Sequence, residues 1–485
     1  MGVSNPTDPF VMKGYGRARR WRSMLWYFAL VSTLAAIMGT WVAWEAMQRT
    51  GRTPAELFDY ADRRMEGHPK VEWLAAPMMA VLRKTFDAPA LKERLAMPFN
   101  VPPPPPRRGA GDIVPPDPVP PGATIWRVGP SGSLTQIAEA ARRAKDGDVV
   151  EIEAGDYYGD VASWGQKRLT IRGVNGAARL FAAGKIAEDK AIWVFKDGQF
   201  KVSNIDFIGA RATDGNGAGI RLERGRLHLR GCLFWDNEMG LLTAGVPYAH
   251  DTSLEIEGSE FAYSHVKGRW GHNLYVGAID RLRVSGSHFH HAYRGHLLKS
   301  RAAVNEILFN RLTDEPGGAA SYEANFPNGG QVLMVGNILQ QPQTTENGIM
   351  ISYGEEGYRQ SDNAFVLASN TLVNDHTHGG AFLRLTPGPV RISISNNLLV
   401  GHGSYQVPQS LRPFNDRRAD WRDLARPSRQ DYRIRADARS YGYRLPPDAK
   451  PGDAVVPAAQ YFHPRMVRSL NGVPRLVGAD QRTPH

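Results

Sequence analysis

The chain has almost no cysteine, since Cys232 is the only one among 485 residues. An internal disulfide is therefore excluded. Cys232 lies in the segment from Leu229 to Phe234, directly before Leu233 and Phe234, and we interpret it as a small buried residue. The absence of disulfides is compatible with any compartment, so it leaves localisation open.

The middle of the chain also lacks any excess of charge, although the formal net charge is +11. Residues 1–23 carry five basic and one acidic side chains, and residues 401–485 carry fifteen and eight. These two ends account for the whole excess, so residues 24–400 are net neutral. Binding to nucleic acid requires a basic surface on the folded body and is not expected here.

Charged residues are absent from residues 24–44, MLWYFALVSTLAAIMGTWVAW. As a helix rising about 1.5 Å per residue, this run would span the ~30 Å hydrocarbon core of a bilayer. Aromatic residues near both ends and the basic residues just before it favour a single-pass inner-membrane anchor at residues 24–46. The positive-inside rule then places residues 1–23 in the cytoplasm and the rest in the periplasm. A cleaved signal peptide is less favoured, because its apolar region is typically only ~7–15 residues long.

Two connecting segments are expected between this anchor and the main body. Residues 47–100 predict short amphipathic helices close to the membrane. Residues 101–122, VPPPPPRRGAGDIVPPDPVPPG, contain too much proline for helix or sheet. We therefore expect this Pro-rich linker to form an extended, semi-rigid stalk.

Helical periodicity is missing from the main body, where a short strand-like pattern recurs instead. Its core is a small residue or Asn, one variable position, and then Phe, Leu or Ile. The recurring position falls, at intervals of 23 to 33 residues, on Asn204, Cys232, Ser259, Ser287, Asn310, Asn337, Asn370 and Asn396. Such a period indicates stacked β-coils, each too small to bury its own apolar face. We expect the asparagines to stack as a hydrogen-bonded ladder.

The two ends of the body carry longer motifs, SLTQIAEAARRAKDGDVVEIEAGDYYG before the first coil and DYRIRADARSYGY, QYFHP and PRLVGA near the end. They resemble the opening and closing segments of the pectin-lyase-like family of right-handed parallel β-helices. The resemblance implies an all-β fold, with a single-stranded parallel β-helix at residues 123–402 and a C-terminal capping segment at residues 403–485. A helix at residues 134–145 would cover the first coil. Many relatives are polysaccharide lyases, hydrolases or epimerases and others only bind glycans, so the fold does not choose among them.

One strand of each coil is expected to line a groove. Aligning the inward apolar residues predicts the outward column Arg221, Thr243, Tyr275, Lys299, Glu323, Ser352 and Arg384. Because neighbouring coils lie ~4.8 Å apart, Tyr275, Lys299 and Glu323 would be in mutual reach. With His296 they form the predicted catalytic set. The predicted substrate-binding residues are His272, Asn273, Arg301, Asn325 and Arg384.

Cleavage of a uronic-acid glycan by a lyase needs a cation for the carboxylate, a base for the C5 proton and a donor for the leaving oxygen. Residues 296–307, HLLKSRAAVNEI, resemble the strand and turn of the alginate lyase and chondroitinase B family. That resemblance implies Lys299 as the base, and Tyr275 or His296 is then the donor. The assisting arginine of that family is replaced by Glu323 and Asn325, and an acidic neighbour opposes a neutral lysine. In the alternative assignment Glu323 is the general acid or base, and Lys299 or Arg301 holds the carboxylate.

No cofactor or metal is predicted, since His288, His290 and His291 lack a recognisable ligand spacing. Binding of calcium is left as an alternative, although the sequence contains no dense carboxylate cluster that would form its site. A DPHD-like epimerase motif is also absent. We therefore predict a membrane-anchored protein that acts on a polysaccharide, by lyase or hydrolase chemistry, with envelope export proteins as further partners. The alternatives are a non-catalytic glycan-binding protein and a structural partner in the envelope.

Overall fold

The computed structural model describes Phe58 and residues 69–85, 100–244, 248–267, 270–342, 345, 347–376, 379–438 and 441–482. The chain divides into two compact units, Met1–Leu91 and Lys92–His485. In the first unit, helix α3 (Pro69–Thr85) lies within the predicted helical segment at residues 47–100. Among the described residues, no helix is both long and apolar enough to cross a membrane. The predicted anchor at residues 24–46 and the segment at residues 1–23 lie outside the described residues.

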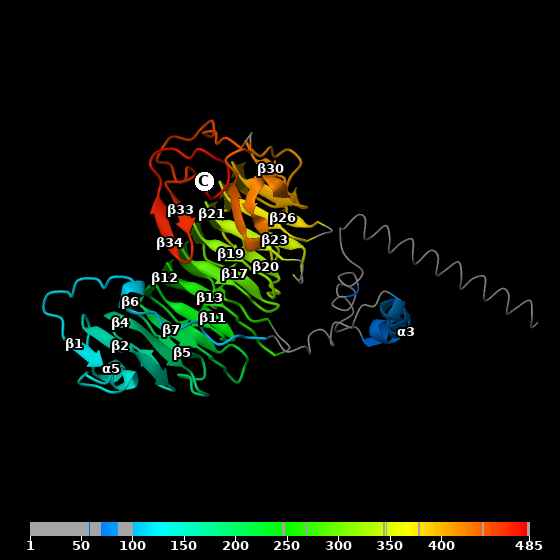
Figure 1. The fold of residues 1–485 in the computed structure, drawn as a ribbon. Coiled ribbons are helices and arrows are strands. Elements are labelled where there is room, and N and C mark those ends of the chain that lie inside the picture. The colour runs from blue at the N-terminus through cyan, green and yellow to red at the C-terminus, as the bar shows by residue number, and fades with distance from the viewer. Residues whose placement is uncertain are drawn as a thin grey trace, which may run out of the picture. The chain divides into compact units, whose positions relative to one another are not determined.

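The second unit is an all-β, right-handed parallel β-helix, as the sequence predicts (Figure 1). One face is a ten-stranded parallel sheet to which each coil gives one strand. Its strands are β3 (Ala162–Trp164), β5 (Ala191–Phe195), β8 (Ala218–Leu222), β11 (Met239–Thr243), β14 (Leu274–Val276), β17 (His296–Ser300), β20 (Tyr322–Phe326), β23 (Ile349–Tyr353), β26 (Ala381–Leu385) and β29 (Ser404–Gln406).

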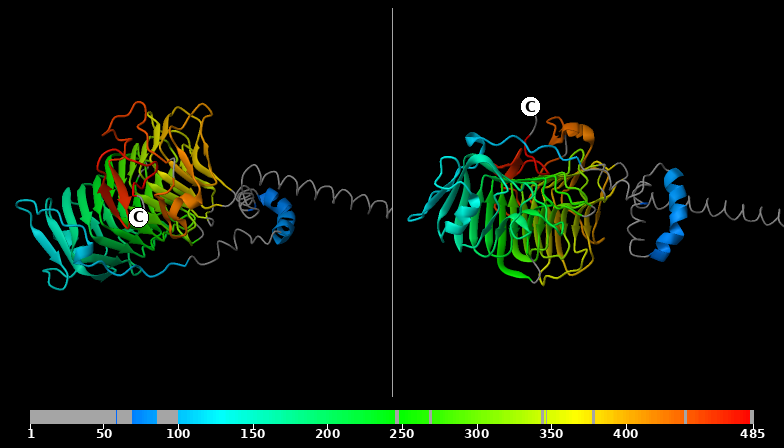
Figure 2. Two further views of the ribbon diagram at one scale, coloured as in Figure 1. Left: turned by 45° about the horizontal axis from the view of Figure 1, so that its top comes forward. Right: turned by 90° about the horizontal axis from the view of Figure 1, so that it is seen from below.

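The other two faces belong to one 20-stranded sheet, because the long strands β2 (Val149–Tyr158) and β4 (Arg168–Phe181) run through both (Figure 2). The second ladder continues from them with β6 (Gln199–Ser203), β9 (Arg226–Arg230), β12 (Ala249–Glu257), β15 (Ile279–Ser285), β18 (Val304–Leu308), β21 (Gln331–Val335), β24 (Ala364–Ala368) and β27 (Arg391–Ser395), and starts at β1 (Ile125–Val128). The third ladder continues with β7 (Ile205–Ile208), β10 (Leu233–Trp235), β13 (Glu260–Ala262), β16 (His288–His290), β19 (Arg311–Thr313), β22 (Ile338–Gln341), β25 (Thr371–Asn374), β28 (Leu398–Gly401) and β30 (Arg417–Ala419).

Equivalent side chains of successive coils stack inside the β-helix. The rings of Phe207, Phe234, Phe261 and Phe289 follow one another with centroids 5.1, 4.3 and 4.8 Å apart, and all four are fully buried. These are the large apolar residues of the recurring pattern, which explains their spacing in the sequence. The apolar repeat therefore forms one continuous core rather than a core for each coil.

The predicted stack of hydrogen-bonded asparagines is confirmed in the turns that lead into the strands of the third ladder. The Oδ1 atom of Asn337 accepts from the backbone N–H of Asn310 at 2.9 Å, and Asn370 accepts likewise from Asn337 at 2.9 Å. Asn397 continues the ladder by accepting from Asn370 at 2.8 Å, so the last predicted member, Asn396, is wrong by one residue. The preceding glycine, as at Gly336 with φ of +66°, supplies the left-handed backbone of the turn.

The first coil is covered by a helix shorter than the predicted one. Helix α5 (Ile137–Arg143) packs Ile137 and Ala140 into the core. Asp160, which lies outside the helix, caps its start by accepting from the backbone N–H groups of Ile137 and Ala138 at 2.6 and 3.0 Å. The open end of the core is thereby protected from solvent.

The Pro-rich segment at residues 101–122 does not behave as a free stalk, and this expectation is corrected. Its residues lie along the β-helix, where Arg108 pairs with Asp206 and Asn204 exchanges two 2.9 Å hydrogen bonds with the backbone of Val114. Trp235 donates its indole N–H to the Pro102 carbonyl at 3.0 Å. Proline removes donors from this segment but leaves its carbonyls free to accept, so it can still dock on a polar surface.

The C-terminal residues 403–485 do more than cap the last coil. After β29 and β30 they form two antiparallel pairs, β31 (Leu424–Arg426) with β32 (Asp431–Ile434) and β33 (Ala459–Phe462) with β34 (Met466–Ser469). This segment runs back over the third ladder (Figure 2), where Arg465 reaches Glu260 at 3.5 Å. It thus covers the side of several middle coils.

Candidate functional site

The outward column of the ten-stranded sheet differs from the prediction at two coils. Strand pairing gives the order Arg221, Leu242, Tyr275, Lys299, Asn325, Ser352 and Arg384. Leu242 replaces Thr243, which is buried and accepts from the backbone N–H of Gly277 at 2.8 Å. Asn325 replaces Glu323 next to Lys299.

A cluster of charged side chains forms around Lys299, Arg301 and Glu356, and we call it the Lys299 cluster. One carboxylate oxygen of Glu356 lies 3.3 Å from the Lys299 ammonium, and Arg301 contacts both oxygens at 2.7 and 3.0 Å. Arg301 also donates to the Tyr275 hydroxyl at 3.4 Å, and both cations lie over the Tyr275 ring at 5.5 and 5.9 Å from its centroid. Two cations therefore share one carboxylate beside an aromatic face.

The loop that follows β23 supplies a second carboxylate to the same face. Glu355 accepts from the Asn325 amide at 2.7 Å and from the Ser352 hydroxyl. Asn328 accepts from Arg301. Because these partners come from two neighbouring coils, the stacking of β20 and β23 fixes the loop over the column.

Two buried histidines lie beside the column. The ring centroids of His272 and His296 are 4.6 Å apart, and the ring of Tyr322 contacts His296 edge to face at 4.8 Å. The Nδ1 atom of His272 accepts from the backbone N–H of His296 at 2.9 Å, so its proton is on Nε2. Burial, with the charges of Lys299 and Arg301, lowers the pKa of His272 to about 3. Burial, with the charges of Lys299 and Arg301, also holds the pKa of His296 well below its ordinary value. Both rings are neutral at neutral pH.

Glu356 is the anion that balances this cluster. Burial pushes its pKa up, but hydrogen bonds from Arg301 and the charges of Lys299 and Arg301 bring the pKa below its ordinary value. The side chain of Glu356 is 38% exposed, against 13% for Lys299 and 18% for Arg301. Glu356 is therefore the most exposed of these three charged side chains.

Three predicted site residues lie elsewhere. Glu323 points into the core with no exposed surface, and burial, then the charge of Asp314, raises its pKa well above the ordinary value. Asn273 is fully buried and donates to the carbonyls of Phe261 and His290 at 3.1 and 2.8 Å, so it holds a turn. Arg384 lies in the column but three coils from Lys299, where it donates to Gln406 at 2.8 Å. The structure therefore brings together Tyr275, Lys299, Arg301, Asn325, His272 and His296 from the predicted set.

Glu356 and Glu355 are the functional candidates that the prediction did not select. Their stretch, YGEEGY, is typical of a surface loop, and nothing in its own residues shows that it folds over Lys299. The sequence signal that could have identified them is the pair of adjacent carboxylates, Glu355 and Glu356, just after the predicted groove strand that contains Ile351. Tyr322 was placed inward because of its size, whereas the inward residue of β20 is the small Ala324.

The fold and the cluster define a class: the chain is a right-handed parallel β-helix with a mixed cationic and aromatic cluster on the outward face of its ten-stranded sheet. No known family profile and no curated protein matches the sequence. The chain is similar in structure to pectate lyase Pel9A, with 10% identity, 75% of this chain and 98% of that chain covered, and a TM-score of 0.45. It is also similar to ORF18 of Geobacillus virus E2, with 13% identity, 57% and 53% covered, and a TM-score of 0.37. The chain thus spans about half the length of the viral protein. At these values the likeness carries no functional argument.

Proposed function

We propose that this chain binds and cleaves an acidic polysaccharide on the outward face of the ten-stranded sheet. The single observation that carries the proposal is the sharing of Glu356 by Lys299 and Arg301 beside Tyr275. A uronate carboxylate has the charge and shape of the Glu356 carboxylate, and Arg301 offers it two parallel N–H groups. The flat face of Tyr275 offers an apolar surface for a sugar ring.

The reaction that fits these groups is lyase-type elimination. Displacement of Glu356 by the substrate carboxylate leaves Arg301 to neutralise that carboxylate. Lys299, when neutral, takes the C5 proton, the bond from C4 to the glycosidic oxygen breaks, and Tyr275 donates its proton to the leaving oxygen. Because Tyr275 accepts from Arg301, its own O–H remains free to donate. His272 and His296 hold this coil in place as neutral rings.

A second candidate function is glycan binding without turnover. The observation that favours it is the ion pair between Lys299 and Glu356, because an opposite charge stabilises the ammonium form that cannot act as a base. In this alternative the same cluster holds a polyanion, and export or modification of the polysaccharide is carried out by partner proteins.

Cleavage by the full chain tests the proposal. Polyuronates and neutral glucans are supplied as substrates, and ultraviolet absorbance of unsaturated uronates is followed together with reducing ends. Lys299→Ala is expected to lose about 10²-fold or more in kcat, as for loss of a general base. Glu356→Gln is expected to lower KM, since the internal competitor for Arg301 is gone.

The matched control is Lys167→Ala, which removes an exposed lysine in the turn between β3 and β4 of the first coil, where it pairs with Asp197 at 2.8 Å. It should leave both products unchanged. New reducing ends without ultraviolet absorbance would show that the enzyme is a hydrolase and not a lyase. The absence of any product from every polyuronate, with binding retained, would support the glycan-binding alternative.

A further inference from the structure

A second cluster of polar side chains lies on the outward face of the third ladder, away from the ten-stranded sheet. The parallel register sets Glu260 of β13 opposite His288 of β16, and Ala262 opposite His290. Neighbouring coils are ~4.8 Å apart and alternate residues of a strand share a face, so Glu260, His288 and His290 point the same way. His288 and His290 are only 5 and 6% exposed.

Donor atoms of these three side chains converge. The Nε2 atom of His290 is 3.3 Å from Oε1 of Glu260, and the rings of His288 and His290 are 4.4 Å apart. One nitrogen or oxygen atom from each of the three lies within 4.8 Å of the others. Around a tetrahedral ion with ligand bonds of ~2.1 Å, donor atoms are roughly 3.4 Å apart, so small side-chain rotations suffice.

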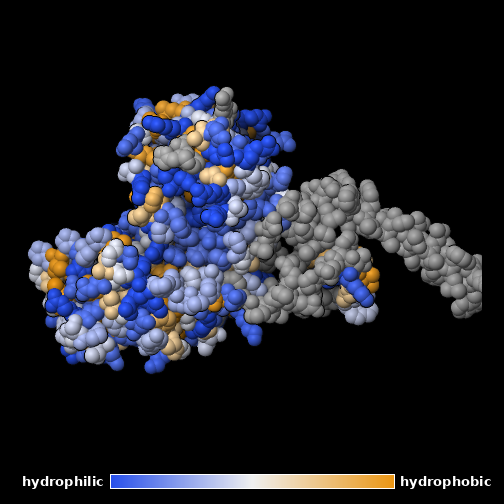
Figure 3. Space-filling model, in the orientation of Figure 1, coloured by the Kyte–Doolittle hydropathy of each residue, from blue (hydrophilic) through white to orange (hydrophobic). Residues whose placement is uncertain are grey.

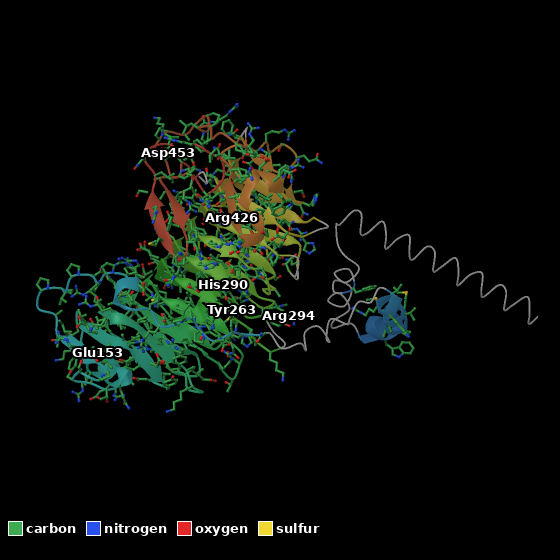
Figure 4. All side chains as sticks on the ribbon, viewed as in Figure 1. Glu153, Tyr263, His290, Arg294, Arg426 and Asp453 are labelled. Carbon is green, nitrogen blue, oxygen red and sulfur yellow. The ribbon has the colours of Figure 1, made fainter. Side chains whose placement is uncertain are left out.

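The cluster opens onto a cavity of about 580 Å³ between the third ladder and the C-terminal segment. Glu260 and His288 line one wall, and Tyr461 and His463 line the opposite one. The ring of His463 lies 5.4 Å from that of His288. Figure 4 labels His290 midway along the β-helix, beside Tyr263 of the preceding coil. Such a cavity leaves room for water or a small anion as a further ligand.

The neighbours of the cluster match the outer partners of a metal site. Glu315 lies 3.1 Å from Nε2 of His288, a carboxylate–histidine contact of the kind that orients metal-binding imidazoles. The guanidinium of Arg465 lies 3.5 Å from the second oxygen of Glu260, which turns the first oxygen toward His290. The ladder itself is rigid, since its strands pair in register on both sides.

We propose that Glu260, His288 and His290 bind one divalent transition-metal ion of the Zn²⁺ type, with an open coordination position that faces the cavity. Two imidazoles and one carboxylate are ligands that Zn²⁺ accepts with a water in the fourth position. The sequence does not reveal this site, because Glu260 lies 28 residues before His288 and only the coil stacking joins them. The ion would cross-link two neighbouring coils beneath the C-terminal segment.

Zinc binding by the full chain tests this proposal. The chain is stripped with a chelator, and Zn²⁺ is titrated in competition with a chromophoric chelator. We expect one ion per chain, and at least about 10-fold weaker affinity in His290→Gln and in Glu260→Gln. The matched control is His250→Gln, which alters an exposed histidine of β12 and should bind as the wild type does.

Circular dichroism of each variant shows whether it is folded. Should His290→Gln fail to fold, the isosteric Glu260→Gln decides the outcome. Failure of the wild-type chain to take up Zn²⁺, or equal affinity in Glu260→Gln and His250→Gln, would overturn the proposal. Neither result depends on whether the Lys299 cluster cleaves polysaccharide.

Discussion

At the scale of single residues, the pKa values of two glutamates, Glu356 and Glu323, are shifted in opposite directions by their surroundings. Glu356 is kept ionised by two cations at the surface, whereas Glu323 is buried without a cation and its pKa is raised. Gln341 donates to Glu323 at 3.5 Å, which is a contact a neutral carboxyl also accepts. The protein therefore carries an ionisable group whose charging opposes folding.

The pH dependence of stability follows from Glu323. Its pKa is higher in the folded chain than in the unfolded chain, where it is about 4.3. Below that pH, Glu323 is neutral in both the folded and the unfolded chain and does not oppose folding. As the pH rises toward the folded-state pKa, the side chain ionises in the unfolded chain only, so the free energy of unfolding falls. Glu323→Gln keeps the shape and removes the titration, so its unfolding temperature should fall less between pH 5 and pH 8 than that of the wild type. Parallel profiles for the two proteins, measured by thermal unfolding, would contradict this assignment.

Single residues also mark the limit of prediction for the site. Tyr275 and Lys299 could be identified because each follows a clear inward leucine, and Arg301 because it lies two residues beyond Lys299. In strand β20 the inward residue is the small Ala324, and hydrophobicity alone favours Tyr322 for that place. The slip from Tyr322 to Ala324 is two residues and shifts the pairing, so the residue beside Lys299 is Asn325 and not Glu323.

At the scale of elements, the coil turns are held by polar ladders inside an apolar core. Asn337 receives a hydrogen bond from the backbone N–H of Asn310 and donates to the Ile307 carbonyl at 2.7 Å. The Asn310 N–H and the Ile307 carbonyl are both buried, so water cannot replace the Asn337 side chain as their partner. An unsatisfied buried polar group costs about 1–3 kcal/mol. The ladder therefore makes each coil depend on the next one.

Removal of one ladder side chain should show this dependence. Asn337→Ala leaves two buried backbone groups unpaired, so we expect a loss of about 2–6 kcal/mol in unfolding free energy. Asn216→Ala, in a surface turn where the side chain contacts Asp214 at 3.0 Å, is the control and should cost less than about 1 kcal/mol. Denaturant unfolding measures both. A loss in Asn337→Ala no larger than that of the control would show that the ladder is not a source of stability.

The elements that repeat were the predictable ones. The spacing of the ladder positions and of Phe207, Phe234 and Phe261 gave the coils directly, because stacking requires equivalent residues in each coil. The return of residues 403–485 over the third ladder has no such signal. Its contacts, such as that of Arg311 with Gln430, join residues 119 positions apart and follow no period.

At the scale of the whole molecule, the β-helix is a long platform whose faces are used differently. The side that carries the third ladder is covered by the Pro-rich segment and by the C-terminal segment, as the contacts of Arg108 and Arg465 show. The surface seen in Figure 3 is mainly hydrophilic over the β-helix, with scattered apolar patches. The face of the β-helix seen there is therefore largely polar, which is compatible with the proposed binding of a glycan.

The distribution of charge at this scale limits how a polyanion can be held. Residues 24–400 carry no net charge, whereas residues 401–485, which pack over the third ladder, carry fifteen basic and eight acidic side chains. Long-range attraction of a polyanion would therefore come from the C-terminal segment, and binding on the ten-stranded sheet has to come from local contacts. The predicted membrane anchor and the periplasmic localisation remain predictions from the sequence. In the proposed function, recognition of an acidic glycan on this sheet depends on the local contacts of Lys299 and Arg301.

Binding of a polyuronate oligosaccharide to the full chain, followed by isothermal titration, is the measurement that tests the central claim most directly. Arg301→Ala removes the two contacts to Glu356 and should weaken binding at least about 10-fold, as expected for loss of a charge-assisted bidentate contact. Arg391→Ala, an exposed arginine paired with Asp362 at 2.7 Å in β27, is the matched control and should bind as the wild type does. A wild-type chain that binds no polyuronate, or equal affinity in the two variants, would contradict the account.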